Sequence, residues 1–211
     1  MKKFFVMAAA LLLLGFQANA QLIGGAGYIY SSEKTSGVDG TTPFHGFYAG
    51  ASYKLDLGKG FGVAPGLYAS FLLHNENAND GGAKANYNVD GNDREFALNV
   101  PVKLTYTLDL GNDRAVFAYT GPVFQLGLTN TTTVTGSVSV LGLNLSGGSK
   151  VDNYEKDYMN RFNIYLGGGI GFQLGDLLFH LGYDHSLLDI DKSTNYVTSR
   201  GQFKLGVGIE F

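Results

Sequence analysis

The residues with the most obvious capacity for chemistry are Asp184, His185 and Ser186, which are consecutive near the end of an alternating segment. A histidine that takes a proton from a serine hydroxyl is the basis of many hydrolytic sites. Successive strand residues point to opposite faces, however, so His185 cannot readily hold Ser186 for proton transfer. We therefore predict that the chain has no catalytic residue and is not an enzyme.

The other polar clusters do not have the spacing of a metal or cofactor site. Residues 189–193 start like a calcium loop, but Thr194 stands where such a loop needs glycine and Arg200 where it needs a bidentate glutamate. The glycines at 167–171 lie within an alternating stretch and not before a helix, so they do not form a phosphate loop. We expect no metal and no cofactor. The remaining histidines also lack metal-ligand spacing and are His45, His74 and His180.

The amino terminus has the features of a secretory signal peptide. Lys2 and Lys3 precede an apolar run that is too short for a spanning helix, and the pattern Ala18-Asn19-Ala20 suits cleavage. We predict a signal peptide at 1–20 and one mature domain at 21–211. Loss of the two lysines would move the formal net charge from −3 to −5, which gives no support to nucleic-acid binding. The chain has no cysteine, which excludes disulfides and thiol chemistry.

Composition and periodicity indicate β-structure. The chain holds 31 glycines and 28 phenylalanines and tyrosines (15 + 13) but only 4 prolines. Apolar residues alternate strictly with polar or small ones in the last segment, where the apolar face is Phe203, Leu205, Val207, Ile209 and Phe211. Similar alternation predicts eight strands at 21–31, 44–57, 61–74, 95–108, 116–128, 158–174, 177–187 and 199–211.

The predicted strands are joined alternately by short turns and by long polar links. Turns at 58–60, 109–115 and 175–176 are brief, whereas the links at 75–94 and 129–157 are long. That alternation is typical of outer-membrane barrels, which have tight periplasmic turns and longer outer loops. We predict an all-β, antiparallel up-and-down transmembrane β-barrel of eight strands, located in the cell outer membrane with both termini in the periplasm.

The apolar face of each strand is expected to contact lipid and the other face to line the lumen. A soluble barrel such as a lipocalin is the rival fold, but it would expose the aligned glycines of 167–171 to solvent without benefit. In a narrow lumen they make room for opposing side chains, and charged residues must be paired. The predicted lumen charges are Lys54, Glu95, Lys103, Arg161, His180, Asp184, Lys204 and Glu210, beside Tyr48, Tyr68, Tyr119 and Tyr165. Which cation meets which anion depends on strand stagger and is left open.

Local features make further structural predictions. Pro65, Pro101 and Pro122 fall inside strands, so the ladders there must bulge or break. Val134, Val138, Val140, Leu143 and Leu145 are interleaved with Thr, Ser, Gly and Asn. This pattern predicts a hairpin beyond the membrane that turns near 141–143. Two additional spanning strands, giving ten, are the alternative.

Aromatic residues are predicted to gather at the short turns as an interfacial girdle: Tyr53, Phe61, Tyr106, Phe172, Phe179 and Phe211.

Several motifs resemble the PorT-like family of outer-membrane barrels. These are Leu98-Asn99-Val100-Pro101-Val102-Lys103-Leu104, Tyr119-Thr120-Gly121-Pro122, the stretch Tyr165–Leu188 and the strand that closes on Phe211. More distantly, the chain is similar to small OmpA- and OmpX-type barrels, without a peptidoglycan-binding domain after Phe211. The resemblance implies that Phe203, Leu205, Val207, Ile209 and Phe211 are the signal read by the barrel-assembly machinery.

We expect a structural or surface-interaction role through the outer loops. The partners would be outer-membrane lipids, the barrel-assembly machinery and possible surface proteins or glycans, without nucleic acid. A narrow porin-like transport channel is the first alternative. A lipid-modifying outer-membrane enzyme is the second.

Overall fold

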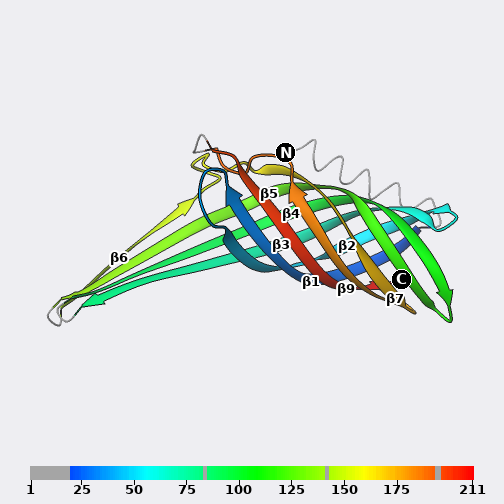
Figure 1. Cartoon of the computed structure of the whole chain (residues 1–211), viewed down its shortest axis with the longest axis horizontal. Coiled ribbons are helices and arrows are strands. Elements are labelled where there is room, and N and C mark those ends of the chain that lie inside the picture. Colours follow the sequence, from blue (N-terminus) through cyan, green and yellow to red (C-terminus); the bar gives the residue numbers. More distant parts are fainter. Residues whose placement is uncertain (1–19, 83–84, 141–142, 193–195) are drawn as a thin grey trace.

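A computed structural model describes residues 20–82, 85–140, 143–192 and 196–211 (Figure 1). The predicted signal peptide at 1–20 lies outside these residues except for Ala20. In the part of the chain that is described, no helix is long and apolar enough to cross a membrane.

Antiparallel β-strands account for most of the described chain. In chain order they are β1 (Ala20–Thr35), β2 (Thr42–Gly58), β3 (Phe61–Gly82), β4 (Ala85–Gly111), β5 (Arg114–Val140), β6 (Leu143–Asp152), β7 (Phe162–Leu174), β8 (Leu177–Ser186) and β9 (Thr198–Glu210). Consecutive strands pair with each other, except that β6 and β7 do not: both of them pair with β5.

The sheet closes on itself. β1 pairs with both β2 and β9, and β4 pairs with β5, so every strand except β6 belongs to one ring of eight. The predicted up-and-down barrel of eight strands is therefore confirmed. We call the end with the short turns β2–β3, β4–β5 and β7–β8 the turn end, and the opposite end the loop end.

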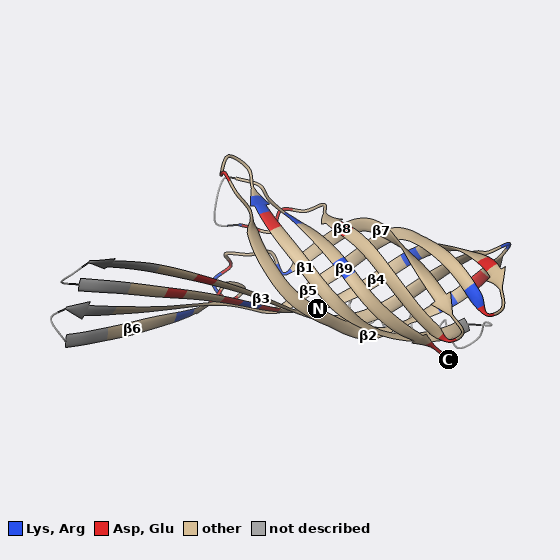
Figure 2. Ribbon diagram, turned by 60° about the horizontal axis from the view of Figure 1, so that its bottom comes forward, with Lys and Arg blue, Asp and Glu red and all other residues tan. Residues whose placement is uncertain are grey.

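Three ring strands run past the loop end and form a projecting sheet with β6. Residues 74–82 of β3 pair with 85–93 of β4, while residues 131–140 of β5 lie between β4 and β6 (Figures 1 and 2). Val140 at the end of β5 pairs with Leu143 at the start of β6, which confirms the predicted hairpin; the predicted turn residues 141 and 142 lie outside the described residues. The predicted strand ends at 74 and 95 were wrong, because residues 75–82 and 85–94 of this polar link pair with each other and, in β4, with the extension of β5.

The prolines interrupt the ladders as predicted. Pairing of β3 with β4 stops at Pro65 and resumes at Tyr68, and pairing of β4 with β5 stops at Pro101 and resumes at Leu104. Pro122 on β5 falls opposite the second gap but stays paired with β7. Pro65 has no partner on β2, Pro101 has none on β3 and Pro122 has none on β4, so each missing N–H donor falls in a gap of a ladder.

The register of the β7–β8 hairpin brings glycines opposite larger lumen residues. The pairs are His180 with Gly171, Gly182 with Gly169 and Asp184 with Gly167, all as predicted from the two-residue turn. In the β2–β3 hairpin the predicted pairs Ser52–Gly66 and Gly50–Tyr68 are present. The third predicted pair, Lys54 with Ala64, falls in the gap beside Pro65.

Candidate functional site in the barrel lumen

The barrel wall is apolar on its outer face. Ile170, Leu205 and Phe47 project outward with exposed fractions of 65%, 61% and 66%, whereas Lys103 and Asp184 are buried in the lumen. Figure 2 shows few charges along the middle of the barrel ribbon. Such an inversion of the soluble pattern suits a barrel that is surrounded by lipid.

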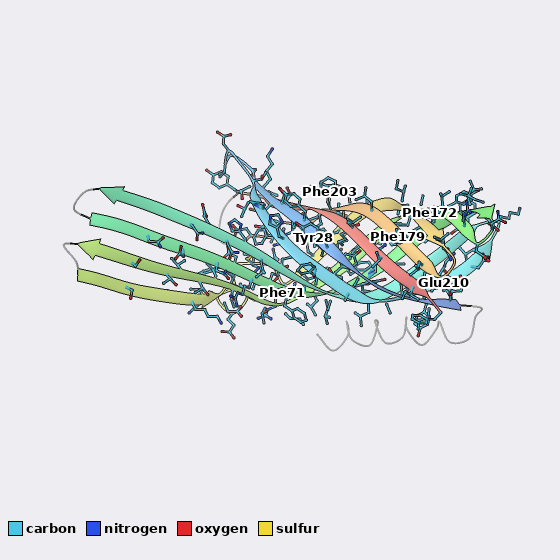
Figure 3. All side chains as sticks on the ribbon, turned by 90° about the horizontal axis from the view of Figure 1, so that it is seen from below. Tyr28, Phe71, Phe172, Phe179, Phe203 and Glu210 are labelled. Carbon is cyan, nitrogen blue, oxygen red and sulfur yellow. The ribbon has the colours of Figure 1, made fainter. Side chains whose placement is uncertain are left out.

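Aromatic side chains gather at two levels of this outer face (Figure 3). The predicted girdle at the turn end includes the cross-strand pair Phe61–Tyr106, whose ring centroids are 4.9 Å apart, and the pair Phe172–Phe179. A second girdle lies toward the loop end and contains Tyr28, Phe47, Phe71, Tyr183 and Phe203. On β9 the two girdles are separated by the span from Phe203 to Phe211, close to the ~9–11 residues with which a tilted strand crosses a bilayer.

One charged cluster lies in the middle of the lumen. The Asp184 carboxylate on β8 accepts a hydrogen bond from Lys103 Nζ on β4 and another from Lys204 Nζ on β9, both at 2.8 Å. Lys103 also donates to the carbonyl oxygen of Gly121 at 2.8 Å. The cluster joins strands across the barrel, and its charge is two cations to one anion.

A second, more deeply buried cluster closes the loop end. The Arg200 guanidinium on β9 is 1% exposed and binds both Glu95 oxygens at 2.8 and 2.9 Å while also pairing with Glu33 on β1. Its Cζ lies 5.5 Å from the centre of the Phe44 ring. Two carboxylates therefore share one guanidinium, which is almost completely buried.

Neutral polar side chains fill the space around this second cluster. Tyr165 donates to Gln125 at 3.2 Å, Gln125 to Asn99 at 3.1 Å and Asn99 to Ser70 at 2.8 Å. This chain of hydrogen bonds crosses from β7 through β5 and β4 to β3. We call Arg200, Glu33, Glu95 and these hydrogen-bonded residues the plug.

The residues predicted to carry charge in the lumen differ in their location and in their partners. Lys103, Asp184 and Lys204 meet in one cluster, and Glu95 belongs to the plug. His180 Nε2 lies 2.5 Å from the Tyr48 hydroxyl, and Glu210 accepts a hydrogen bond from Gln173 at 3.3 Å near the turn end. Lys54 lines the lumen.

Arg161 is not a lumen residue. β7 begins at Phe162, so the alternation that placed Arg161 inside does not extend to it. Its side chain is exposed and its guanidinium lies 5.1 Å from the Tyr154 ring centre. The prediction failed because the four residues before Phe162 form a connection and not the start of a strand.

Arg200 and Glu33 are charged residues of the lumen that the sequence analysis did not include. Arg200 lies four residues before Lys204 on β9 and therefore on the same face of the strand, so the alternation in the sequence could have placed it in the lumen. Glu33 lies on β1 two residues beyond the predicted strand end at 31, where no alternation of apolar residues remains. Only the strand pairing brings these two residues to Glu95, which is far away in sequence.

The residues considered for catalysis and metal binding lie apart. His185 is exposed on the outer face, while buried Ser186 accepts a hydrogen bond from the backbone N–H of Arg200 at 2.7 Å. No group of three or more His, Cys, Asp or Glu side chains in the described ranges could hold a metal ion. His45 also lies on the outer face, where it contacts Tyr28.

Glycines make room for tyrosines in the narrow bore. A methyl group on Gly206 would overlap the Tyr48 hydroxyl and lie 2.6 Å from His180 Cε1. We therefore expect Gly206→Ala to lower the free energy of unfolding by about 1–3 kcal/mol through overpacking. Urea unfolding in lipid vesicles measures this. Gly136→Ala is the matched control, since nothing lies within 4 Å of its added methyl; equal stability of the two variants would contradict the packing argument.

A cavity of about 180 Å³ occupies the remaining lumen. Its lining runs from Ile29 and Val123 in the middle of the barrel to Lys54, Thr107 and Gln173 beside the short turns. The Arg200 cluster is not part of the lining. The lumen thus consists of a packed plug at the loop end and a cup toward the turn end.

No protein-family model and no curated protein sequence matches this chain. Among solved structures it is similar to the Yersinia pestis attachment invasion locus protein Ail, with 15% identity over 92% of this chain and 100% of that one and a TM-score of 0.39. It is also similar to Neisserial surface protein A, with 12% identity, coverage of 92% and 99% and a TM-score of 0.44. Pseudomonas aeruginosa OprG shares 13% identity over 92% and 96%, with a TM-score of 0.35. The closed barrel itself is established by the strand pairing of this chain.

Proposed function

We propose that this chain is an integral outer-membrane protein that binds an extended polypeptide strand at the cell surface through its projecting sheet. The observation that supports this most is the pair of open edges on that sheet. Beyond His74, β3 has β4 as its one partner strand in the described chain, and β6 has only β5. Open strand edges carry unpaired N–H and C=O groups that can pair with an added strand.

The composition of the projecting sheet supports a position in water. Glu76 and Asn77 on β3, Asp90 on β4 and Lys150 on β6 are exposed. Such residues are costly in lipid, whereas the ring strands below them present the apolar girdled wall. In this arrangement the short turns and both strand termini of the barrel face the periplasm and the sheet faces outward.

We also propose that barrel-assembly machinery recognises β9 and that the protein has no enzymatic activity. The outward side chains of β9 and the residue after it, Phe203 to Phe211, are exposed and apolar, which suits recognition by barrel-assembly machinery before lipid covers them. We propose no enzymatic role, because Ser186 and His185 lie on opposite faces of β8. Release of fatty acid from labelled lipid A by the purified protein would contradict that.

Cysteine labelling of intact cells tests the membrane location and orientation. The chain has no cysteine, so single substitutions report on one site each. Ser149→Cys on β6 should react with a membrane-impermeant maleimide in intact cells. Asp176→Cys in the β7–β8 turn should react only after the outer membrane is opened. Labelling of Asp176→Cys and protection of Ser149→Cys in intact cells would reverse the proposed orientation.

Photo-crosslinking tests the partner. A crosslinking amino acid at position 149 should capture a protein on the cell surface, and the yield should fall when Lys150→Pro removes a backbone donor from β6. Lys150→Ala is the control that keeps the donor. Crosslinks to carbohydrate alone, or a yield that is insensitive to proline, would contradict strand pairing and favour a glycan partner.

A further inference from the structure

The cup at the turn end has the size and lining of a small-molecule site. Its volume of about 180 Å³ compares with the ~150 Å³ engineered cavity that binds benzene in another protein. Much of its wall is apolar and includes Ile23, Ile29, Phe117, Val123 and Leu178. A compact apolar body such as one aromatic ring therefore fits this space.

The charged groups that face the cup have an excess of positive charge. Lys54, Lys103 and Lys204 line it together with a single carboxylate, Asp184, so the balance with neutral histidine is 3 − 1 = +2. Glu210, held by Gln173 near the turn end, would reduce the excess to +1. An uncompensated cation is costly in a confined space of low dielectric constant, and a bound anion would offset that cost.

Two hydrogen-bond donors in the lining have no acceptor in the described part of the protein. No hydrogen bond or ion pair of a described residue involves Lys54 Nζ, and none involves the Tyr119 hydroxyl. Gly169 and Gly182 leave the space that the Tyr119 hydroxyl occupies, since a methyl group on either would overlap it. The two glycines thus make room for a hydroxyl that has no hydrogen-bond partner among the described residues.

We infer that the cup binds a small monocarboxylate with a compact apolar body, of the size of benzoate. The carboxylate would accept hydrogen bonds from Lys54 and Tyr119, and the ring would contact Phe117 and Leu178. Because the plug closes the loop end, the ligand enters and leaves at the turn end. This goes beyond the proposed surface role and does not depend on it.

Calorimetric titration of the full chain in lipid nanodiscs tests the inference. Benzoate should bind saturably, whereas benzamide, which has the same shape without the charge, should bind about tenfold more weakly or worse. Benzylamine, which is cationic, should not bind. Equal affinity for benzoate and benzamide, or no saturable benzoate binding, would overturn the inference. Binding of octanoate without binding of benzoate would overturn the compact shape.

Variants locate the site. Lys54→Met and Tyr119→Phe should each weaken benzoate binding about tenfold, as expected for loss of a hydrogen bond to a charged group. Lys150→Met on the projecting sheet should leave it unchanged. Benzoate affinity that is the same in Lys54→Met, Tyr119→Phe and Lys150→Met would place any binding elsewhere. If either lumen variant fails to fold, the comparison of benzoate, benzamide and benzylamine on the unmodified protein still tests whether the cup binds a carboxylate.

Discussion

Replacing Arg200 by methionine should lower the free energy of unfolding by about 3–5 kcal/mol, the cost of breaking a buried ion pair from one side. The substitution leaves Glu33 and Glu95 facing each other without a cation, and Glu95 is only 3% exposed. Methionine keeps much of the side-chain length, so the effect reports the lost charge more than a cavity. Urea unfolding in lipid vesicles, followed by the heat-dependent gel mobility of the barrel, measures it.

An exposed ion pair is the matched control for that result. Lys192 Nζ lies 2.6 Å from Asp157 Oδ1, but these side chains are 40% and 78% exposed, so Lys192→Met should cost less than about 1 kcal/mol. Adding Glu33→Gln and Glu95→Gln to Arg200→Met should recover part of the loss, because it removes the unpaired charges. If Arg200→Met were no more harmful than Lys192→Met, the plug would not stabilise the barrel.

Replacing Asp184 by asparagine should also be strongly destabilising, by about 3–5 kcal/mol. The change removes the one anion that Lys103 and Lys204 share, and these lysines are then left close together in the lumen. Lys103→Met should cost less, since Asp184 still pairs with Lys204 at 2.8 Å. The same unfolding measurement ranks the two variants.

The double variant Asp184→Asn with Lys103→Met provides the check. It leaves a single cation, Lys204, beside a neutral amide, and should be more stable than Asp184→Asn alone. A double variant whose loss equals the sum of the two single losses would show that the groups do not interact, contrary to the shared carboxylate.

Much of the barrel could be predicted from the sequence because strand periodicity acts locally. Alternation in 199–211 predicted which residues of β9 face lipid and which face the lumen. The two-residue turn between β7 and β8 predicted the residues of β7 that lie opposite Asp184 and His180. The pairing of β5 with β6 followed from alternation of apolar and polar residues in the same way. These features depend on neighbours within one hairpin.

The ion pairs could not be predicted because they depend on the closure of the ring. Arg200 meets Glu95 across the lumen, from strands 105 positions apart in sequence, and no local pattern states the stagger that aligns them. The same limit applies to Lys103 and Asp184. The extensions of β3 and β4 over 75–82 and 85–94 were missed for another reason: their Asn, Asp and Gly residues have low β-propensity, and they are supported by each other and by the extension of β5.

The most direct test of the closed, lipid-embedded barrel is conductance of the purified full chain in planar bilayers. An eight-stranded barrel has an interior that side chains fill, whereas aqueous channels need ~16–18 strands, and here the plug blocks the loop end. We predict no steady conductance of the unmodified protein in ordinary salt and a measurable leak for Arg200→Met. Large, stable channels formed by the unmodified protein would contradict the closed barrel and favour a transport function.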